Sequence, residues 1–184
     1  MTATSRGARR GPSGRGQTVT LHPLRWWDIA SLGHLERGVF GEDAWSDELF
    51  WSELAQGDTR LYLVARDEGE AIVGYAGLAI HGEEAYVQTI AVVARWRGSG
   101  LGTRLLVAIL RYARERGARA CGLEVRTDND AARSVYQRFG FVDIGIRRGY
   151  YQPSGADAYV MVLRGLHRSD YGRHLDRLET AVSR

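Results

Sequence analysis

The chain has 184 residues, of which 44% are apolar, and its formal charge is +3. This length and composition fit one globular domain, and no apolar run approaches the roughly 18 residues that a membrane-spanning helix needs. All 25 basic residues are arginine, and the absence of lysine excludes a Walker-A phosphate loop and a Schiff-base enzyme.

The N-terminal segment accounts for the positive charge. Residues 1–17 contain four arginines and no acidic residue, so the rest of the chain is close to neutral. Such an Arg/Gly-rich segment is typical of a disordered tail that could contact nucleic acid weakly, and it lacks the apolar core of a secretory signal. We therefore expect a cytoplasmic protein without a membrane partner. Cys121 lies in an apolar stretch and the five histidines lack ligand spacing, so we expect no metal.

Apolar periodicity predicts strands and helices that alternate along the chain. The expected strands cover residues 19–24, 61–65, 72–80, 86–93, 120–125, 142–147 and 158–163. The expected helices cover residues 26–40, 46–57, 101–116 and 129–139. This order describes one mixed α/β domain over residues 18–165, followed by an extension over residues 166–184 that could add a short helix. Trp27 and Leu49 are among the side chains expected to face the core.

A glycine-rich turn leads into the long helix expected at residues 101–116. Gly98, Gly100 and Gly102 would present several backbone N–H groups in one concavity, with no Cβ to block a close approach. The turn therefore predicts an anion site, for example for a pyrophosphate, although a solvated turn has the same composition. A dinucleotide site is the main alternative, since Glu124 ends the next strand where a ribose-binding acid would lie. The G-x-G-x-G spacing and the few elements that follow count against it.

The segment Arg97-x-x-Gly100-x-Gly102 resembles the acetyl-CoA signature of the GNAT acetyltransferase superfamily, and Ile90-Ala91-Val92 resembles the strand before it. The resemblance implies a mixed sheet of about six to seven strands, splayed between the fourth and fifth and flanked by about four helices. It also implies acetyl-CoA as co-substrate, with its pantetheine arm on the backbone of Ile90 and Val92. The amides implied to surround the pyrophosphate are those of Arg97, Gly98, Ser99, Gly100, Leu101, Gly102 and Thr103.

Further segments resemble the RimI group, the bacterial ribosomal-protein alanine N-acetyltransferases. These segments are Leu123-Glu124-Val125-Arg126, Asn129-x-x-Ala132-x-x-x-Tyr136 and Arg147-Arg148-x-Tyr150-Tyr151. The resemblance implies acetylation of a protein's N-terminal amine, typically that of an alanine on the small-subunit ribosomal protein numbered eighteen. The residues it assigns are Glu124 as general base, Tyr136 as general acid and as a cofactor-binding residue, Asn129 on the pantetheine, and Tyr150 and Tyr151 in the acceptor-binding loop.

The reaction itself needs a base and an acid. An α-amine has a pKa of about 7.7–8.0, so near neutrality a base must remove a proton from most of it. Glu124 can project into the cleft, because its neighbours Leu123 and Val125 point to the opposite face. The departing thiolate must gain a proton, which an unperturbed Tyr136 can supply at a cost of roughly 2 kcal/mol. No activated nucleophile is apparent beside the cofactor, so direct attack is expected.

Each assignment has a structural alternative. Glu124 could have a purely structural role as the ion-pair partner of an arginine such as Arg126, and Tyr136 could be a core residue. Asn129 could cap the helix that follows it, alone or in addition to a binding role. The tyrosine pair at residues 150–151 could be a packed turn.

The acidic residues near the second helix and the function of the whole chain also allow alternatives. Glu42, Asp43 and Asp47 could attract an acceptor's ammonium group or could form a solvated helix start. The chain could be a GNAT enzyme for another acceptor, such as a different protein N-terminus, a lysine side chain or a small amine. It could also be a CoA- or nucleotide-binding module without catalysis, although such a module needs neither Glu124 nor Tyr136.

Overall fold

The computed structural model describes residues 18–182, which form a seven-stranded sheet in the order β1-β2-β3-β4-β5-β7-β6. The strands are β1 (Val19–Pro23), β2 (Arg60–Asp67), β3 (Ile72–His81), β4 (Glu84–Val92), β5 (Ala120–Arg126), β6 (Val142–Arg147) and β7 (Ala158–Arg164). The α-helices of the described chain are α1 (Ile29–Phe40), α2 (Asp47–Leu54), α3 (Leu101–Glu115), α4 (Asp130–Arg138) and α5 (Ser169–Val182). The expected splayed α/β fold is confirmed, and the short helix considered for the extension is α5, which has 14 residues.

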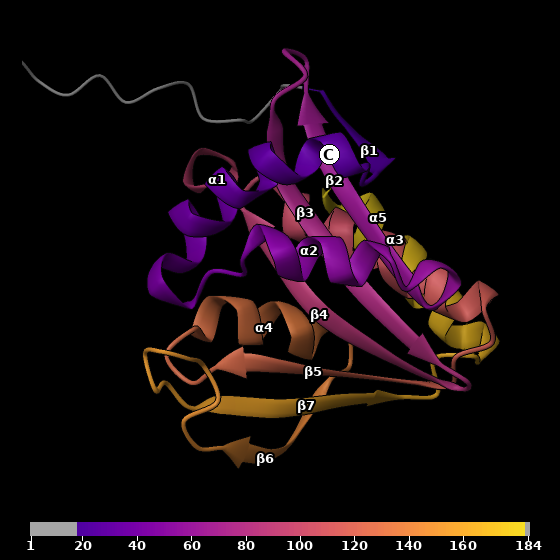
Figure 1. Cartoon of the computed structure of the whole chain (residues 1–184). Helices are drawn as coiled ribbons and strands as arrows, with labels where there is room; N and C mark the ends of the chain where they lie inside the picture. Colours follow the sequence, from indigo (N-terminus) through magenta and orange to yellow (C-terminus); the bar gives the residue numbers. More distant parts are fainter. Residues whose placement is uncertain (1–17, 183–184) are drawn as a thin grey trace, which may run out of the picture.

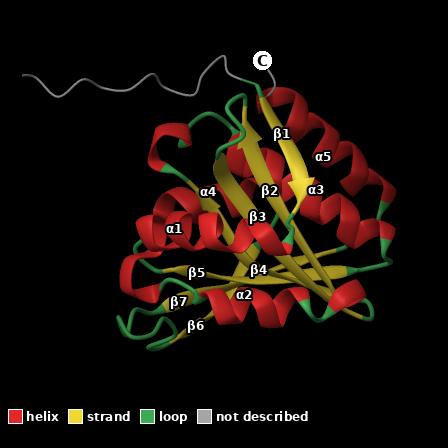
Figure 2. Ribbon diagram, turned by 45° about the horizontal axis from the view of Figure 1, so that its top comes forward, coloured by secondary structure: helices red, strands yellow, loops and turns green. Residues whose placement is uncertain are grey.

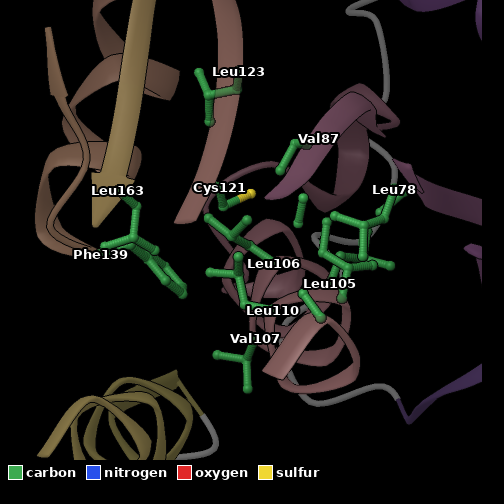
Figure 3. Packing of buried hydrophobic residues seen from close by; sticks show 14 of the residues in the cluster. Leu78, Val87, Leu105, Leu106, Val107, Leu110, Cys121, Leu123, Phe139 and Leu163 are labelled. Carbon is green, nitrogen blue, oxygen red and sulfur yellow. The ribbon is translucent and has the colours of Figure 1, made fainter. Parts of the chain in front are cut away.

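Helices cover both faces of the sheet. α1 and α2 lie on one face, while α3 and α5 lie on the other (Figures 1 and 2). The main core lies between the sheet and α3, where Leu105, Leu106 and Leu110 are fully buried near Cys121 (Figure 3). Burying each such leucine contributes roughly 1.5–3 kcal/mol. Val107 points away from the sheet but is equally buried, because α5 covers the outer side of α3.

Two apolar side chains do not lie where the periodicity predicts. Trp27 is 61% exposed and Leu49 is 38% exposed. Residues 26–28 form a separate 3-10 turn before α1, in which the Arg25 N–H donates to the Asp28 carboxylate at 3.1 Å. The break turns Trp27 away from the core, and its ring instead packs edge-on against Trp26 at 5.4 Å. Among residues 18–182 no helix is both long and apolar enough to span a bilayer.

The central parallel pair of strands comes apart along its length. β4 and β5 pair only from Glu84 with Ala120 to Val87 with Leu123. Beyond that point β4 stays paired with β3 up to Val92, and β5 stays paired with β7 up to Arg126. The two strands diverge in Figure 1 and leave the facing edges of their carboxyl-terminal halves without a partner strand. An extra residue in β4 at Gln88, opposite Gly77 and Leu78, forms a bulge where the pairing stops.

Candidate active site

Two cavities meet where β4 and β5 diverge. The first, about 770 Å³, lies between the end of β4, the glycine turn, the start of α3 and one side of α4. The second, about 540 Å³, lies between β4, β5, the α1–α2 connection and the β6–β7 loop. Ile90, Asn129 and Tyr136 line both cavities. A ligand in one cavity can therefore reach a ligand in the other through the gap in the sheet.

The glycine turn presents free backbone donors to the first cavity. Gly98 and Gly100 have φ angles of 75° and 86°, which other residues rarely adopt. The N–H groups of Gly98, Gly100, Gly102 and Thr103 make no hydrogen bond within residues 18–182, and all four residues line the cavity. Such a group of donors at the start of a helix suits a phosphate or pyrophosphate.

The other three amides of the turn are engaged within it. Arg97 N–H donates to the Ala94 carbonyl at 3.2 Å, and Ser99 N–H donates to the Trp96 carbonyl at 3.3 Å. Leu101 N–H is 3.4 Å from Ser99 Oγ, so it is only weakly engaged. The Arg97 side chain does line the cavity, and its Nε lies 3.4 Å from the Val92 carbonyl. The backbone donors that remain available to a ligand are therefore the four amides of Gly98, Gly100, Gly102 and Thr103.

Ile90 and Val92 lie on the unpaired stretch of β4 and line the first cavity. Asn129 lies across the gap at the start of α4, where its side-chain oxygen accepts from Ala132 N–H at 3.1 Å. The helix-cap alternative for Asn129 is thus observed. Its side-chain NH₂ group makes no hydrogen bond within residues 18–182, so the same residue can also donate to a ligand.

Glu124 lies on the wall of the second cavity, and its side chain is only 3% exposed. Its Oε1 is 2.7 Å from Arg147 Nη1, and the Tyr150 hydroxyl donates to Oε2 at 3.4 Å. Burial raises the pKa of Glu124, while Arg147 and the Tyr150 hydrogen bond lower it. The Arg147 contact at Oε1 is an ion pair without hydrogen-bond geometry, and the Tyr150 hydrogen bond to Oε2 is long, so the carboxylate can still accept a proton.

The cationic partner of Glu124 is Arg147 and not Arg126, the arginine considered from the sequence. Arg126 instead pairs with Asp43 at 2.8 Å and with Asp128 at 2.9 Å. Arg147 is the last residue of β6, which pairs with β7, and β7 in turn pairs with β5. The Arg-Arg-Gly-Tyr-Tyr segment marked this region of the sequence as functional. The pairing of Arg147 with Glu124, however, follows only from the strand order β5-β7-β6.

Tyr136 lies on the inner side of α4, and its ring packs edge-to-face on Phe141 at 5.9 Å. No described residue hydrogen-bonds its hydroxyl, although the ring lines both cavities. Burial raises the pKa of Tyr136 to about 12, so the hydroxyl stays protonated at neutral pH. The residue therefore packs against the core and also carries a proton beside the junction of the cavities.

Tyr150 and Tyr151 lie on the β6–β7 loop and line the second cavity. Their rings meet at right angles with centroids 5.1 Å apart, and burial raises the pKa of each to about 12. The loop is held to the α1–α2 connection by Asp43, whose role was open from the sequence. The side chain of Asp43 is only 4% exposed, so it is not part of a solvated helix start.

Comparisons with known proteins agree with this geometry. A model of the acetyltransferase (GNAT) family matches residues 24–141. The chain is 42% identical over 150 residues to the N-alpha-acetyltransferase RimI of Mycobacterium tuberculosis, which covers 79% of this chain and 92% of that protein.

Solved structures show the same fold. The ribosomal-protein-S18-alanine N-acetyltransferase from Escherichia coli superposes with a TM-score of 0.72 at 31% identity, covering 80% of this chain and 94% of that one. Arabidopsis thaliana NAA60 in complex with acetyl-CoA superposes with a TM-score of 0.70 at 20% identity, covering 80% and 98%. The second likeness concerns the fold alone.

The fold and the family match define the class: the chain belongs to the GNAT acetyltransferase family and is an N-acetyltransferase. Within that family, its similarity is to RimI enzymes, which act on ribosomal protein bS18 according to the names of several relatives.

Proposed function

We propose that this chain transfers the acetyl group of acetyl-CoA to the N-terminal α-amine of a protein. The observation that carries the proposal is the pair of cavities joined through the divergence of β4 and β5. The four free amides of the turn fit a pyrophosphate, and the unpaired edge of β4 fits an amide-containing arm. Acetyl-CoA bound there would supply the thioester whose acetyl group is transferred.

Glu124 is proposed as the general base. An α-amine of pKa about 7.7–8.0 reaches the second cavity mostly as an ammonium ion, and one proton must leave before nitrogen can attack. The Glu124 side chain lines that cavity, with Oε1 ion-paired to Arg147 at 2.7 Å and Oε2 3.4 Å from the Tyr150 hydroxyl. It accepts the proton directly or through a water molecule, and Arg147 stabilises the ionised form that can do so.

Tyr136 is proposed as the general acid, which donates its hydroxyl proton to the sulfur atom as the carbon–sulfur bond breaks. A pKa of about 12 lies about 3.5 units above that of a free thiol, a cost of roughly 5 kcal/mol. This is an upper bound, because the same burial also disfavours the thiolate and so raises its proton affinity. This cost is smaller than the amount by which enzymes typically lower an activation free energy, so the proton transfer is feasible.

The proposed acceptor is the N-terminal alanine of a small-subunit ribosomal protein. The support is the similarity to enzymes named for this reaction, at 33% and 31% identity. The second cavity, enclosed by the α1–α2 connection and the β6–β7 loop, is large enough for a few residues of an extended chain.

The test is an acetylation assay on peptides that differ only in their first residue, followed by mass spectrometry. An N-terminally blocked peptide with an internal lysine is the negative control. Acetylation of the free N-terminus, with alanine preferred, is expected. Acetylation of the blocked peptide alone would instead establish a lysine acceptor and contradict the proposal.

Glu124→Gln and Tyr136→Phe test the residue roles. We expect kcat/KM for the peptide to fall about 10²- to 10⁴-fold in Glu124→Gln and at least about tenfold in Tyr136→Phe. Acetyl-CoA affinity, measured by calorimetry, should change little in either variant, because neither substitution touches the turn. Full activity in both variants would remove the mechanism and leave the family assignment intact.

A further inference from the structure

One buried carboxylate connects the two segments that enclose the second cavity. Asp43 ends the short turn after α1, and its Oδ1 accepts from Ser154 N–H at 3.1 Å. Its Oδ2 accepts from Ser154 Oγ at 2.7 Å and from Arg126 Nη1 at 2.8 Å. These donors lower the pKa of Asp43, chiefly through Ser154, so the carboxylate stays ionised. Asp43 therefore joins the α1–α2 connection, the end of β5 and the β6–β7 loop.

A chain of contacts leads from Asp43 to the proposed base. The Arg126 guanidinium, held from its other side by Asp128, lies over the Tyr151 ring at 5.5 Å. The Tyr151 ring packs on Tyr150, whose hydroxyl reaches Glu124. Cation–π and edge-to-face contacts of this kind stabilise the relative positions of the groups they join. The position of the tyrosine pair thus depends on Arg126 and on the anchored loop.

The contacts lie at the junction of the two cavities. Asp43, Arg126 and Tyr151 each line both of them. We propose that Asp43 is a positioning residue for the acceptor, which holds the β6–β7 loop through Ser154 and Arg126 in the conformation that receives the acceptor's first residues. The inference rests on the proposed function, because it assigns the second cavity to the acceptor.

A purely electrostatic role for Asp43 predicts a different result. In that case any acid at this place would attract the acceptor's ammonium, and the neighbouring Glu42 would contribute similarly. Glu42 is exposed and has no hydrogen bond or ion pair within the described residues. Glu42→Gln is therefore a matched control, since it removes the same charge one residue away without removing a contact.

The test compares Asp43→Asn, Ser154→Ala and Glu42→Gln in the full chain. We expect Asp43→Asn to raise the KM for the peptide about tenfold, which equals about 1.4 kcal/mol of binding, with kcat and the KM for acetyl-CoA little changed. Ser154→Ala should have a smaller effect, because its backbone N–H still reaches Asp43. Glu42→Gln should behave as wild type.

Hydrogen exchange gives a readout that needs no acetylation. Amides of residues 148–157 should exchange faster in Asp43→Asn than in Glu42→Gln, because the loop loses its anchor. The inference is overturned if the amides of residues 148–157 exchange equally fast in Asp43→Asn and Glu42→Gln. It is also overturned if the KM for the peptide rises equally in the two variants. If the wild-type protein acetylates no peptide, the proposed function fails and the acceptor role fails with it, whereas the exchange data still decide whether Asp43 anchors the loop.

Discussion

Glu124 is subject to two opposing influences whose balance sets its protonation. Burial raises its pKa, and the guanidinium of Arg147 with the Tyr150 hydroxyl lowers it. A base that is too acidic accepts protons poorly, while one that is too basic is already protonated at neutral pH. An exposed arginine 2.7 Å from this buried carboxylate favours the ionised form of Glu124, while burial preserves its affinity for a proton.

Arg147→Gln tests this balance through the pH dependence of kcat/KM. Loss of the cation removes an influence that lowers the pKa of Glu124, so that pKa rises further. Glu124 is active above its pKa, so the lower break of the profile should move to higher pH, while the break that belongs to the acceptor amine stays in place. Activity below pH 7 should then fall several-fold.

Arg148→Gln serves as the control for that profile. Arg148 lies next in the chain but pairs with Asp157, at 2.7 Å, and makes no contact with Glu124. Its profile should match that of the wild type. A downward move of the break in Arg147→Gln, or the same move in both variants, would contradict the role given to Arg147.

At the scale of the element, the strand–turn–helix unit around the glycines could be predicted from the sequence, since glycine spacing and helix periodicity are local. Which amides of the turn are free to bind a ligand could not be predicted, because this depends on the 3-10 turn Ala94–Trp96, whose carbonyls accept from Arg97 N–H and Ser99 N–H. Likewise, the pairing of Glu124 with Arg147 depends on the order of β5, β7 and β6, which no local pattern contains. The predicted burial of Trp27 was wrong for the opposite reason, because the local 3-10 turn at residues 26–28 interrupts the helical periodicity on which the prediction rested.

Alanine substitutions at Gly98 and Gly100 separate backbone strain from steric contact. Both residues have positive φ, which costs roughly 1–2 kcal/mol for alanine. A Cβ at Gly98 meets open space, whereas one at Gly100 would lie 2.6 Å from Cβ of Val182. Denaturant unfolding should show a loss of about that size in Gly98→Ala and a larger loss in Gly100→Ala. Equal losses would mean that α5 does not pack against the turn.

At the scale of the whole molecule, the segment after residue 165 is part of the folded structure. The sequence left it as an extension because a single amphipathic stretch does not show where it docks. In the structure α5 buries Leu175 fully, and Tyr171 donates its hydroxyl proton to the Phe139 carbonyl at 2.9 Å. Arg111 of α3 pairs with Asp176 of α5 at 2.7 Å. The helix therefore covers α3, and through Val182 it also reaches the first cavity.

Leu175→Ala measures what α5 contributes to stability. Truncating a fully buried leucine should lower the free energy of unfolding by about 2–5 kcal/mol. Arg177→Ala, at an exposed position on the same helix, should stay within about 0.5 kcal/mol of wild type. Similar small losses in both variants would show that α5 is only loosely attached in solution.

The most direct test of the central claim is a ¹⁵N-resolved NMR titration of the whole chain with acetyl-CoA. The account predicts that the largest amide shifts fall on Gly98, Gly100, Gly102 and Thr103 and along the unpaired half of β4, with NAD causing none of them. Shifts confined to another surface, or no shift at the turn at saturating acetyl-CoA, would contradict the placement of the cofactor between β4 and β5.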